Sequence, residues 1–350
     1  FEKAVPMNDP VRKRRGLGRS TVFDVAKLAQ TSAISVSRYF KEPDRVSQET
    51  RDRIKRAIDQ LGYIRNEAAG GLASTQGRIV GAIVPSVSNS IFAETIQGLS
   101  TTLSQHNYQL LLATHDYSIE TEEKVVRAFL GWSPRALVLT GADHSAATET
   151  LLAGLQIPVI ETWDIRPERP YPQIGFSHIA TGRDMTLYLH GQGYRRIVYV
   201  DSGIGSDFRA RKRAQGYEET MRQLGLRAEI VQASVTAPLD AGGQVFSEQM
   251  ARAERPDALF FANDNMAAGA IYAAAQLGIR IPEQCAVAGF GDFPFSEKLS
   301  PALTTIRVPR FDIGRLAAQA ILQRLGEVDE GAAPPALAPL AYELIARASA

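Results

Sequence analysis

The sequence predicts an α/β core of two doubly wound parallel-sheet lobes, preceded by a small all-α domain. From residue 78 onward, apolar runs of strand length alternate with segments of helical period, which is typical of parallel sheets covered on both faces. These runs form two successive series, one for each lobe. Residues 20–66 instead show three short helical patterns, each preceded by a Thr or Ser that can cap a helix.

Length and composition favour a cytoplasmic protein of several domains. A chain of 350 residues exceeds what one hydrophobic core normally serves, so we expect two or three domains. The single cysteine, Cys285, cannot form an intrachain disulfide, which fits a reducing compartment. No apolar run approaches the roughly 18 residues of a membrane span, and no signal-peptide pattern is present. We therefore expect no membrane partner.

Positive charge is concentrated near the N-terminus. Residues 11–66 hold 14 Lys+Arg against 6 Asp+Glu, a net charge of about +8, whereas the whole chain has a net charge of +1. Residues 1–19 lack periodicity, and we expect them to form a basic disordered arm. A basic N-terminal segment joined to an acidic remainder is typical of a DNA-binding module attached to another domain. A generic three-helix core with solvated charges explains the asymmetry poorly.

The pattern of residues 20–66 predicts a helix-turn-helix domain. The first helix follows Thr21, and its expected apolar stripe consists of Val22, Val25, Ala26, Leu28 and Ala29. A tight turn leads to a second helix capped by Ser32, with Val36, Tyr39 and Phe40 facing inward. A third helix follows Ser47 and ends at Gly62. In such a motif the second helix lies in the major groove of DNA.

The stretch DVAKLAQTSAISVSRYFKEPDRVSQETRDRIKRAIDQLGYIRN resembles the head-piece of LacI/GalR transcriptional regulators. Its marks are DVAxLA, S-x-x-S-VSR, VS-x-x-TR-x-R and LGY-x-x-N. The resemblance extends over residues 20–347 and is strongest to repressors of gluconate-type sugar-acid operons. It implies a periplasmic-binding-protein-like core and a homodimeric repressor. It also implies that the protein binds double-stranded operator DNA and a small sugar-type effector.

The resemblance places the operator-binding residues in and beside the second helix and in a hinge. They are Thr21, Ser32, Ala33, Ile34, Ser35, Ser37, Arg38 and Leu72. Ala33 and Ile34 fall on the family's base-reading pair; being apolar, they suit thymine methyl groups rather than bidentate hydrogen bonds. Arg38 is the candidate for reading guanine. Residues 67–77 correspond to the hinge, whose leucine enters the minor groove. A plain flexible linker is the alternative for this segment.

Residues 78–347 are expected to form the effector-binding and dimerisation domain. Ligands of open parallel sheets bind at the carboxyl ends of the strands. The candidates that follow strands here are Ser88, Asn89, Phe92, Asp116, Trp163, Arg209, Arg213, Asn263 and Asp292. The resemblance places Arg213, Asn263 and Asp292 at or next to effector positions. A Trp163 face would suit a sugar ring.

The arginines at 209, 211 and 213 favour an acidic ligand. Their guanidinium forks suit a carboxylate, which indicates a sugar acid such as gluconate. Gly291 stands where the family often has the first of two aspartates, which lessens repulsion of an acid. A solvated helix face is the alternative for each arginine, and a helix cap is the alternative for Asn263.

Motifs for catalysis are lacking in the sequence. The first strand is followed by PSVSN rather than a glycine-rich turn, and HExxH, CxxC and GxSxG do not occur. We therefore expect no enzyme, no cofactor and no metal. Two alternatives to an inducible repressor stay open: a regulator whose ligand acts as co-repressor, and a cytosolic sugar-binding protein with no operator role.

Overall fold

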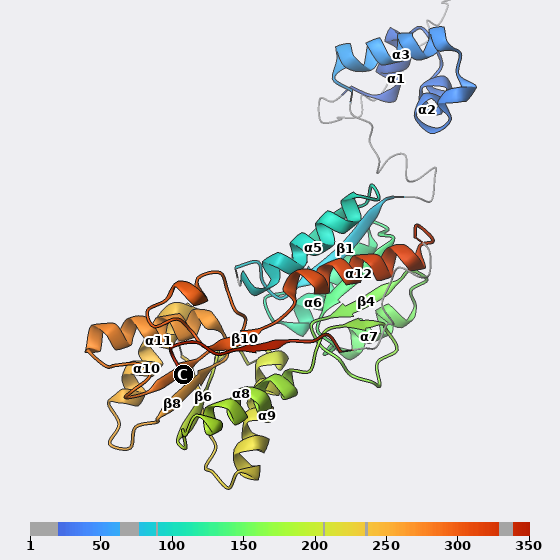
Figure 1. Cartoon of the computed structure of the whole chain (residues 1–350). Coiled ribbons are helices and arrows are strands. Elements are labelled where there is room, and N and C mark those ends of the chain that lie inside the picture. The colour runs from blue at the N-terminus through green and yellow to red at the C-terminus, as the bar shows by residue number, and fades with distance from the viewer. Residues whose placement is uncertain (1–19, 64–76, 89, 206, 235–236, 329–338) are drawn as a thin grey trace, which may run out of the picture. The chain divides into compact units, whose positions relative to one another are not determined.

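The computed structural model describes residues 20–63, 77–88, 90–205, 207–234, 237–328 and 339–350 (Figure 1). The chain divides into two compact units between residues 77 and 78. The predicted basic arm, Leu72 and Asn89 lie outside the described residues. The expectations for them therefore stay predictions.

The N-terminal unit is a bundle of three α-helices. Helix α1 spans Val22–Leu28, α2 spans Ala33–Lys41 and α3 spans Gln48–Leu61, with a short 3₁₀ turn η1 at Pro43–Arg45. The three helices meet around Val25, Val36 and Ile54, whose side chains are fully buried. Gly62 ends α3 with a φ of 56°, a left-handed conformation that glycine adopts at little cost.

The expected apolar stripe of α1 is wrong at Leu28, which is 42% exposed. Val22, Val25, Ala26 and Ala29 are spaced by three and four residues and lie on one helix face. Leu28 falls well to the side of that face, because each residue turns the helix by about 100°. Helical geometry thus leaves this side chain in solvent.

The first lobe of the C-terminal unit is built on a five-stranded parallel sheet of order β2-β1-β3-β4-β5. The strands are β1 Ile79–Val84, β2 Gln109–Thr114, β3 Ala136–Thr140, β4 Val159–Thr162 and β5 Gln173–Ile174. The helices between them are η2 Ser90–Phe92, α5 Ala93–Ser104, α6 Ile119–Leu130 and α7 Ala146–Ala153. The central strands are almost entirely buried, as expected for a sheet covered on both faces.

The second lobe repeats this design with a four-stranded parallel sheet of order β7-β6-β8-β9. Its strands are β6 Ile197–Asp201, β7 Glu229–Gln232, β8 Ala258–Phe261 and β9 Ala286–Ala288. Its helices are α8 His178–Gly191, α9 Phe208–Gln223, α10 Pro238–Met250, α11 Asp264–Leu277 and the short η3 Ser296–Lys298. The two parallel sheets and the helical N-terminal unit confirm the predicted fold class.

The last elements connect the two lobes. Strands β10, Thr305–Arg307, and β11, Glu343–Ile345, pair antiparallel, and helix α12, Arg310–Arg324, returns to pack on α5 (Figure 1). Glycines permit this close packing, because a Cβ at Gly314 would lie 1.9 Å from the carbonyl oxygen of Thr95. Such a contact would force the helices apart, so a side chain is excluded there.

Candidate functional site

Helix α2 of the N-terminal unit is fixed by its caps. The Oγ of Ser32 accepts a hydrogen bond from the backbone N–H of Ser35 at 3.0 Å. In α1, Thr21 and Asp24 form a reciprocal capping box, in which the Asp24 carboxylate accepts from the Thr21 N–H at 2.8 Å. Two capped helices with a turn of four residues between them form a helix-turn-helix.

The predicted DNA-binding residues lie mainly on the surface of this unit. Thr21, Ser32, Ser37 and Arg38 are exposed, whereas Ala33 and Ser35 are partly buried. Ile34 is 69% exposed, although it is a large apolar side chain on a small domain. Its side chain is therefore accessible to another molecule. Leu72, the eighth candidate, lies outside the described residues.

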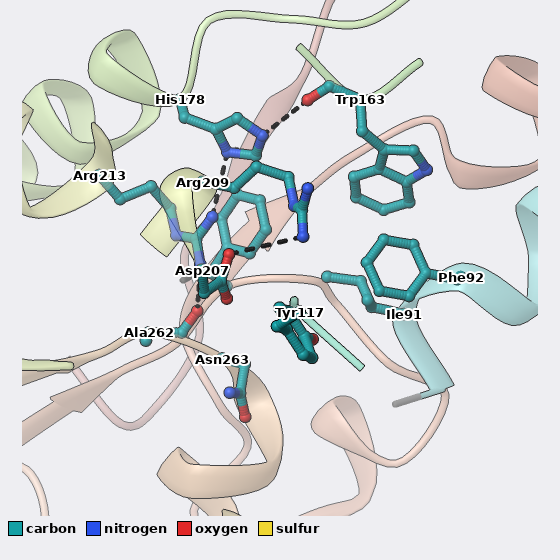
Figure 2. A pocket seen from close by; sticks show the side chains of 11 residues that line it. Ile91, Phe92, Tyr117, Trp163, His178, Asp207, Arg209, Arg213, Ala262 and Asn263 are labelled. Atoms are coloured by element: carbon teal, nitrogen blue, oxygen red, sulfur yellow. Dashed lines mark hydrogen bonds and ion pairs between the residues drawn. The ribbon is translucent and has the colours of Figure 1, made fainter. Parts of the chain in front are cut away.

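A pocket with about 330 Å³ of empty space lies at the carboxyl ends of the strands of both lobes (Figure 2). It is lined by Ile91, Phe92, Tyr117, Trp163, His178, Asp207, Arg209, Arg213, Ala262, Asn263 and Phe290. Every one of these residues follows a strand in the chain, so the two sheets jointly present them. This is the place where parallel sheets bind ligands.

Arg213 lies in the second-lobe wall of the pocket and is fixed by neutral partners. Its Nη1 lies 3.0 Å from Nδ1 of His178, and its Nη2 donates to the Ala262 carbonyl at 2.9 Å. Its guanidinium also stacks 4.0 Å from the ring centre of Phe290. The Nε of Arg213 is buried and has no hydrogen-bond partner in the described part of the chain. Arg213 thus brings a buried positive charge that forms no salt bridge within the described residues, although the buried Asp201 interacts with this charge.

His178 is neutral in this arrangement. Its Nε2 donates to the carbonyl of Trp163 at 2.7 Å, which leaves Nδ1 free to accept from Arg213 (Figure 2). Complete burial lowers the pKa of His178 well below its usual value, and the adjacent Arg213 lowers it further. The imidazole therefore adds no charge near neutral pH, and its tautomer is set by these two contacts.

Arg209 connects the two lobes across the pocket. Its Nη1 donates to the carbonyl of Thr140 at 3.4 Å, and its Nη2 lies 3.6 Å from the Asp207 carboxylate. The guanidinium also faces the rings of Phe92 and Tyr117, at 5.5 and 5.9 Å from their centres. A second-lobe arginine thus contacts three first-lobe residues, which makes it sensitive to how far the lobes are closed.

The structure brings five of the nine predicted effector residues into this pocket. They are Phe92, Trp163, Arg209, Arg213 and Asn263. Asn263 also caps α11, since its Oδ1 accepts from the Met266 N–H at 3.1 Å, so the alternative role as a helix cap is present in a residue that lines the pocket. Trp163 is only 1% exposed; it packs edge-on against Phe92 and donates from Nε1 to Thr95 at 3.1 Å. It lines the wall but presents no open face to a sugar ring.

Three predicted effector residues do not line the pocket. Ser88 and Asp116 are exposed, and Asp292 is held by two arginines of its own lobe. The carboxylate of Asp292 lies 2.7 Å from Nε of Arg307 and 2.7 Å from Nη1 of Arg347. These contacts outweigh the effect of burial and lower the pKa of Asp292. Asn89, the ninth candidate, is outside the described residues.

Six lining residues were not among the predicted effector contacts: Ile91, Tyr117, His178, Asp207, Ala262 and Phe290. All but His178 stand within three residues of a predicted contact, so a wider window after each strand end would have included them. His178 follows β5, which has only two residues and gives no readable strand pattern. Arg211, expected beside Arg209 and Arg213, is exposed and stacks on Phe208 instead.

Residues 21–66 match the family described as bacterial regulatory proteins, lacI family, and residues 186–350 match the periplasmic binding protein-like domain. The HTH-type transcriptional regulator GntR of Pseudomonas aeruginosa is 32% identical over 350 residues, which cover 99% of each chain. This chain belongs to the LacI family.

Two further similarities span most of this LacI-family chain. The HTH-type transcriptional regulator IdnR of Escherichia coli is 31% identical over 312 residues, covering 89% of this chain and 93% of that protein. A crystal structure of a LacI-family transcriptional regulator from Silicibacter pomeroyi superposes with a TM-score of 0.87 at 33% identity. It covers 94% of this chain and 99% of the other.

The LacI-family protein described here is therefore a DNA-binding transcriptional regulator with a two-lobe core. Its relatives named above are regulators of transcription. Within the described ranges, no helix combines the length and apolar character needed to cross a membrane.

Proposed function

We propose that this protein is a homodimeric repressor whose operator affinity is lowered by a sugar acid such as gluconate, which binds in the pocket between the lobes. The observation that carries the proposal is the charge of the pocket wall. Arg209 and Arg213 are both buried there, and Asp207 is the single carboxylate among the lining residues. A buried charge without a partner is costly, so the pocket favours a ligand that brings a carboxylate.

Helix positions add to this preference. Helices α8, α9 and α11 begin at or beside His178, Asp207 and Asn263, all of which line the pocket. The N-terminus of a helix carries a partial positive charge and favours nearby anions. His178 is neutral and therefore adds nothing to the charge of the pocket. The pocket thus carries net positive charge from two arginines and three helix ends against one aspartate.

Apolar walls complete the fit to a sugar acid. Phe92 and Phe290 supply aromatic carbon to the pocket wall beside the two arginines. A polyhydroxy acid has a hydroxyl-bearing carbon chain next to its carboxylate, and such chains pack on aromatic surfaces while their polar groups hydrogen-bond. The resemblance of the sequence to repressors of gluconate-type operons supports the same class of ligand.

Exposed apolar residues support a homodimer. Helices α10 and α11 pack tightly, and their outer surface carries the exposed side chains of Leu239, Tyr272 and Leu277. An apolar patch of this kind favours association with another chain, and a two-fold axis would pair the patch with itself. Such a dimer presents two head-pieces to two operator half-sites in the cytoplasm, where bacterial operator DNA lies.

Arg209 offers a route from the pocket to the DNA. A carboxylate bound beside it would compete for the guanidinium with the Thr140 carbonyl and with the rings of Phe92 and Tyr117. The position of one lobe relative to the other would then depend on the ligand. An effector changes operator affinity only through its different affinity for the two arrangements. The same linkage would serve a co-repressor, and the direction of the response distinguishes the two.

Binding can be tested by tryptophan fluorescence. The chain has two tryptophans, and Trp132 is 61% exposed and does not line the pocket. In Trp132→Phe protein, Trp163 is the remaining reporter and lines the pocket. We expect gluconate to change its emission with saturation, while glucose at the same concentration does not. Saturable binding of glucose with no response to gluconate would refute the acid assignment.

A further inference from the structure

A second pocket, with about 290 Å³ of empty space, adjoins the first. It is lined by residues that follow β2 and β3 and by the start of α9, and Tyr117 and Arg209 line both pockets. This pair, whose guanidinium and ring centre are 5.9 Å apart, therefore borders both spaces. A ligand that contacts Arg209 in the first pocket thus lies next to the second.

His115 is the distinctive group of the second pocket. His115 is only 7% exposed, and neither of its ring nitrogens has a hydrogen-bond partner of ordinary geometry among the described residues. Buried polar groups in folded proteins are nearly always hydrogen-bonded, so an unpartnered imidazole that lines a cavity indicates a ligand. Burial lowers the pKa of His115 and outweighs the opposite effects of Glu122 and of the Ser118 backbone. The ring is neutral and offers one donor and one acceptor.

Two carboxylates line the second pocket, those of Glu122 and Asp143, against one guanidinium, that of Arg209. His144 lies 2.7 Å from the Glu122 carboxylate, and Arg166 pairs with Asp143. The lining thus holds two carboxylates and one guanidinium. The carboxylate oxygens can accept hydrogen bonds from hydroxyl groups, and their excess of negative charge disfavours a second carboxylate.

We propose that the second pocket receives the hydroxyl-bearing end of the effector, with His115 as the residue that recognises this end. This proposal rests on the proposed function, because it takes the carboxylate of the ligand to lie beside Arg209 and Arg213. The charges of the two pockets then orient the ligand. The class of ligand is a polyhydroxy monocarboxylic acid whose far end is an uncharged hydroxyl, and a dicarboxylic sugar acid is rejected.

Isothermal titration calorimetry of the full-length protein tests this at fixed salt. The probes are gluconate, a monoacid, and glucarate, the diacid of the same chain length. We expect the wild type to bind gluconate at least about tenfold more tightly than glucarate. His115→Leu removes both hydrogen-bonding atoms and is expected to weaken gluconate binding about tenfold. His115→Asn retains a donor and an acceptor and is expected to recover part of the affinity.

His190→Leu is the matched control, since this histidine lies at the far end of α8 and lines neither pocket. Thermal melts of each variant establish that it is folded. Equal affinity of wild type and a folded His115→Leu variant for gluconate would overturn the proposal, as would equal binding of gluconate and glucarate by the wild type. Those results leave the proposed function intact, whereas a wild type that binds no sugar acid refutes both.

Discussion

Nη1 of Arg213 donates to Nδ1 of His178 over 3.0 Å, because Nε2 of the same ring is occupied by the Trp163 carbonyl 2.7 Å away. The histidine thus accepts a hydrogen bond from an arginine, which requires it to be neutral. A carboxylate in this position would cancel the charge of Arg213. The neutral partner instead orients the guanidinium and leaves its charge available to a ligand.

Replacement of Arg213 by leucine should abolish tight binding of the acid. Loss of a buried charged partner costs roughly 2–5 kcal/mol in binding, so we expect gluconate affinity to fall by that amount in calorimetry. Arg211→Leu is the control, because Arg211 is an exposed arginine on the same helix. Both variants should bind DNA in the absence of ligand. If they lose the same affinity for gluconate, the buried arginine has no special role.

Stability should decrease as pH rises above neutrality, because of His144. Burial alone would lower the pKa of His144, but its contacts with Glu122 and Glu161 raise it to about 9. Between its ordinary pKa and this value the folded protein holds a proton that the unfolded chain releases. The stabilisation is complete below about pH 6.5 and is lost as pH rises through the folded-state pKa.

The corresponding measurement is the free energy of unfolding from pH 6 to pH 10 in wild type and His144→Gln. The shift corresponds to a contribution on the order of 3 kcal/mol, which the variant lacks. We therefore expect the wild-type curve to fall towards the variant curve between pH 6.5 and pH 9. Parallel curves over this range would show that His144 is not protonated in the folded protein.

Asp264 should contribute to stability through hydrogen bonds rather than charge. This fully buried carboxylate accepts from the hydroxyls of Thr305 and Ser296, at 2.6 and 2.7 Å, and from the Phe293 N–H at 3.1 Å. Burial raises its pKa, so its ionised form is disfavoured. Asp264→Ala leaves these donors unpaired and should cost about 2–4 kcal/mol.

The matched variant Asp264→Asn retains an oxygen for the Phe293 N–H and an amide for a hydroxyl that can rotate. It should lose clearly less stability than the alanine variant in urea unfolding. A loss as large as that of Asp264→Ala would mean that the negative charge, and not the set of hydrogen bonds, stabilises the start of α11.

Arg38 should contribute to sequence discrimination by the head-piece. It is exposed on α2, near the candidate base-reading residues. Arg38→Ala should weaken binding by roughly 1–3 kcal/mol and reduce discrimination. The measurement compares a duplex selected by the wild type from random DNA with a scrambled duplex at one salt concentration. Arg45→Ala, an exposed arginine paired with Glu42, is the control. Unchanged discrimination in Arg38→Ala would remove this residue from base reading.

Much of the fold could be predicted from the sequence, because buried parallel strands consist of consecutive apolar residues that are recognisable as runs. The apolar run IVGAIV forms β1, Ile79–Val84, and the capping residues Thr21, Ser32 and Ser47 all precede helices.

The site was predictable only in part, for identifiable physical reasons. Helical spacing alone places Arg209 and Arg213 on one face and Arg211 on the opposite one, so that distinction was available from the sequence. The absence of Asp292 from the pocket lining could not be predicted from the sequence, because Arg307 and Arg347 bind its carboxylate from distant points of the chain. The partners of His178 likewise come from distant parts of the chain, because Trp163 follows β4 and Arg213 lies in α9.

The most direct test of the account is operator affinity with and without gluconate. A fluorescently labelled duplex selected by the wild type would be titrated with the full-length protein at fixed salt, and anisotropy would report binding. We predict that saturating gluconate weakens binding by about 1–3 kcal/mol and that Arg213→Leu protein shows no such response. Operator affinity that is unchanged, or increased, by bound gluconate would contradict an inducible repressor.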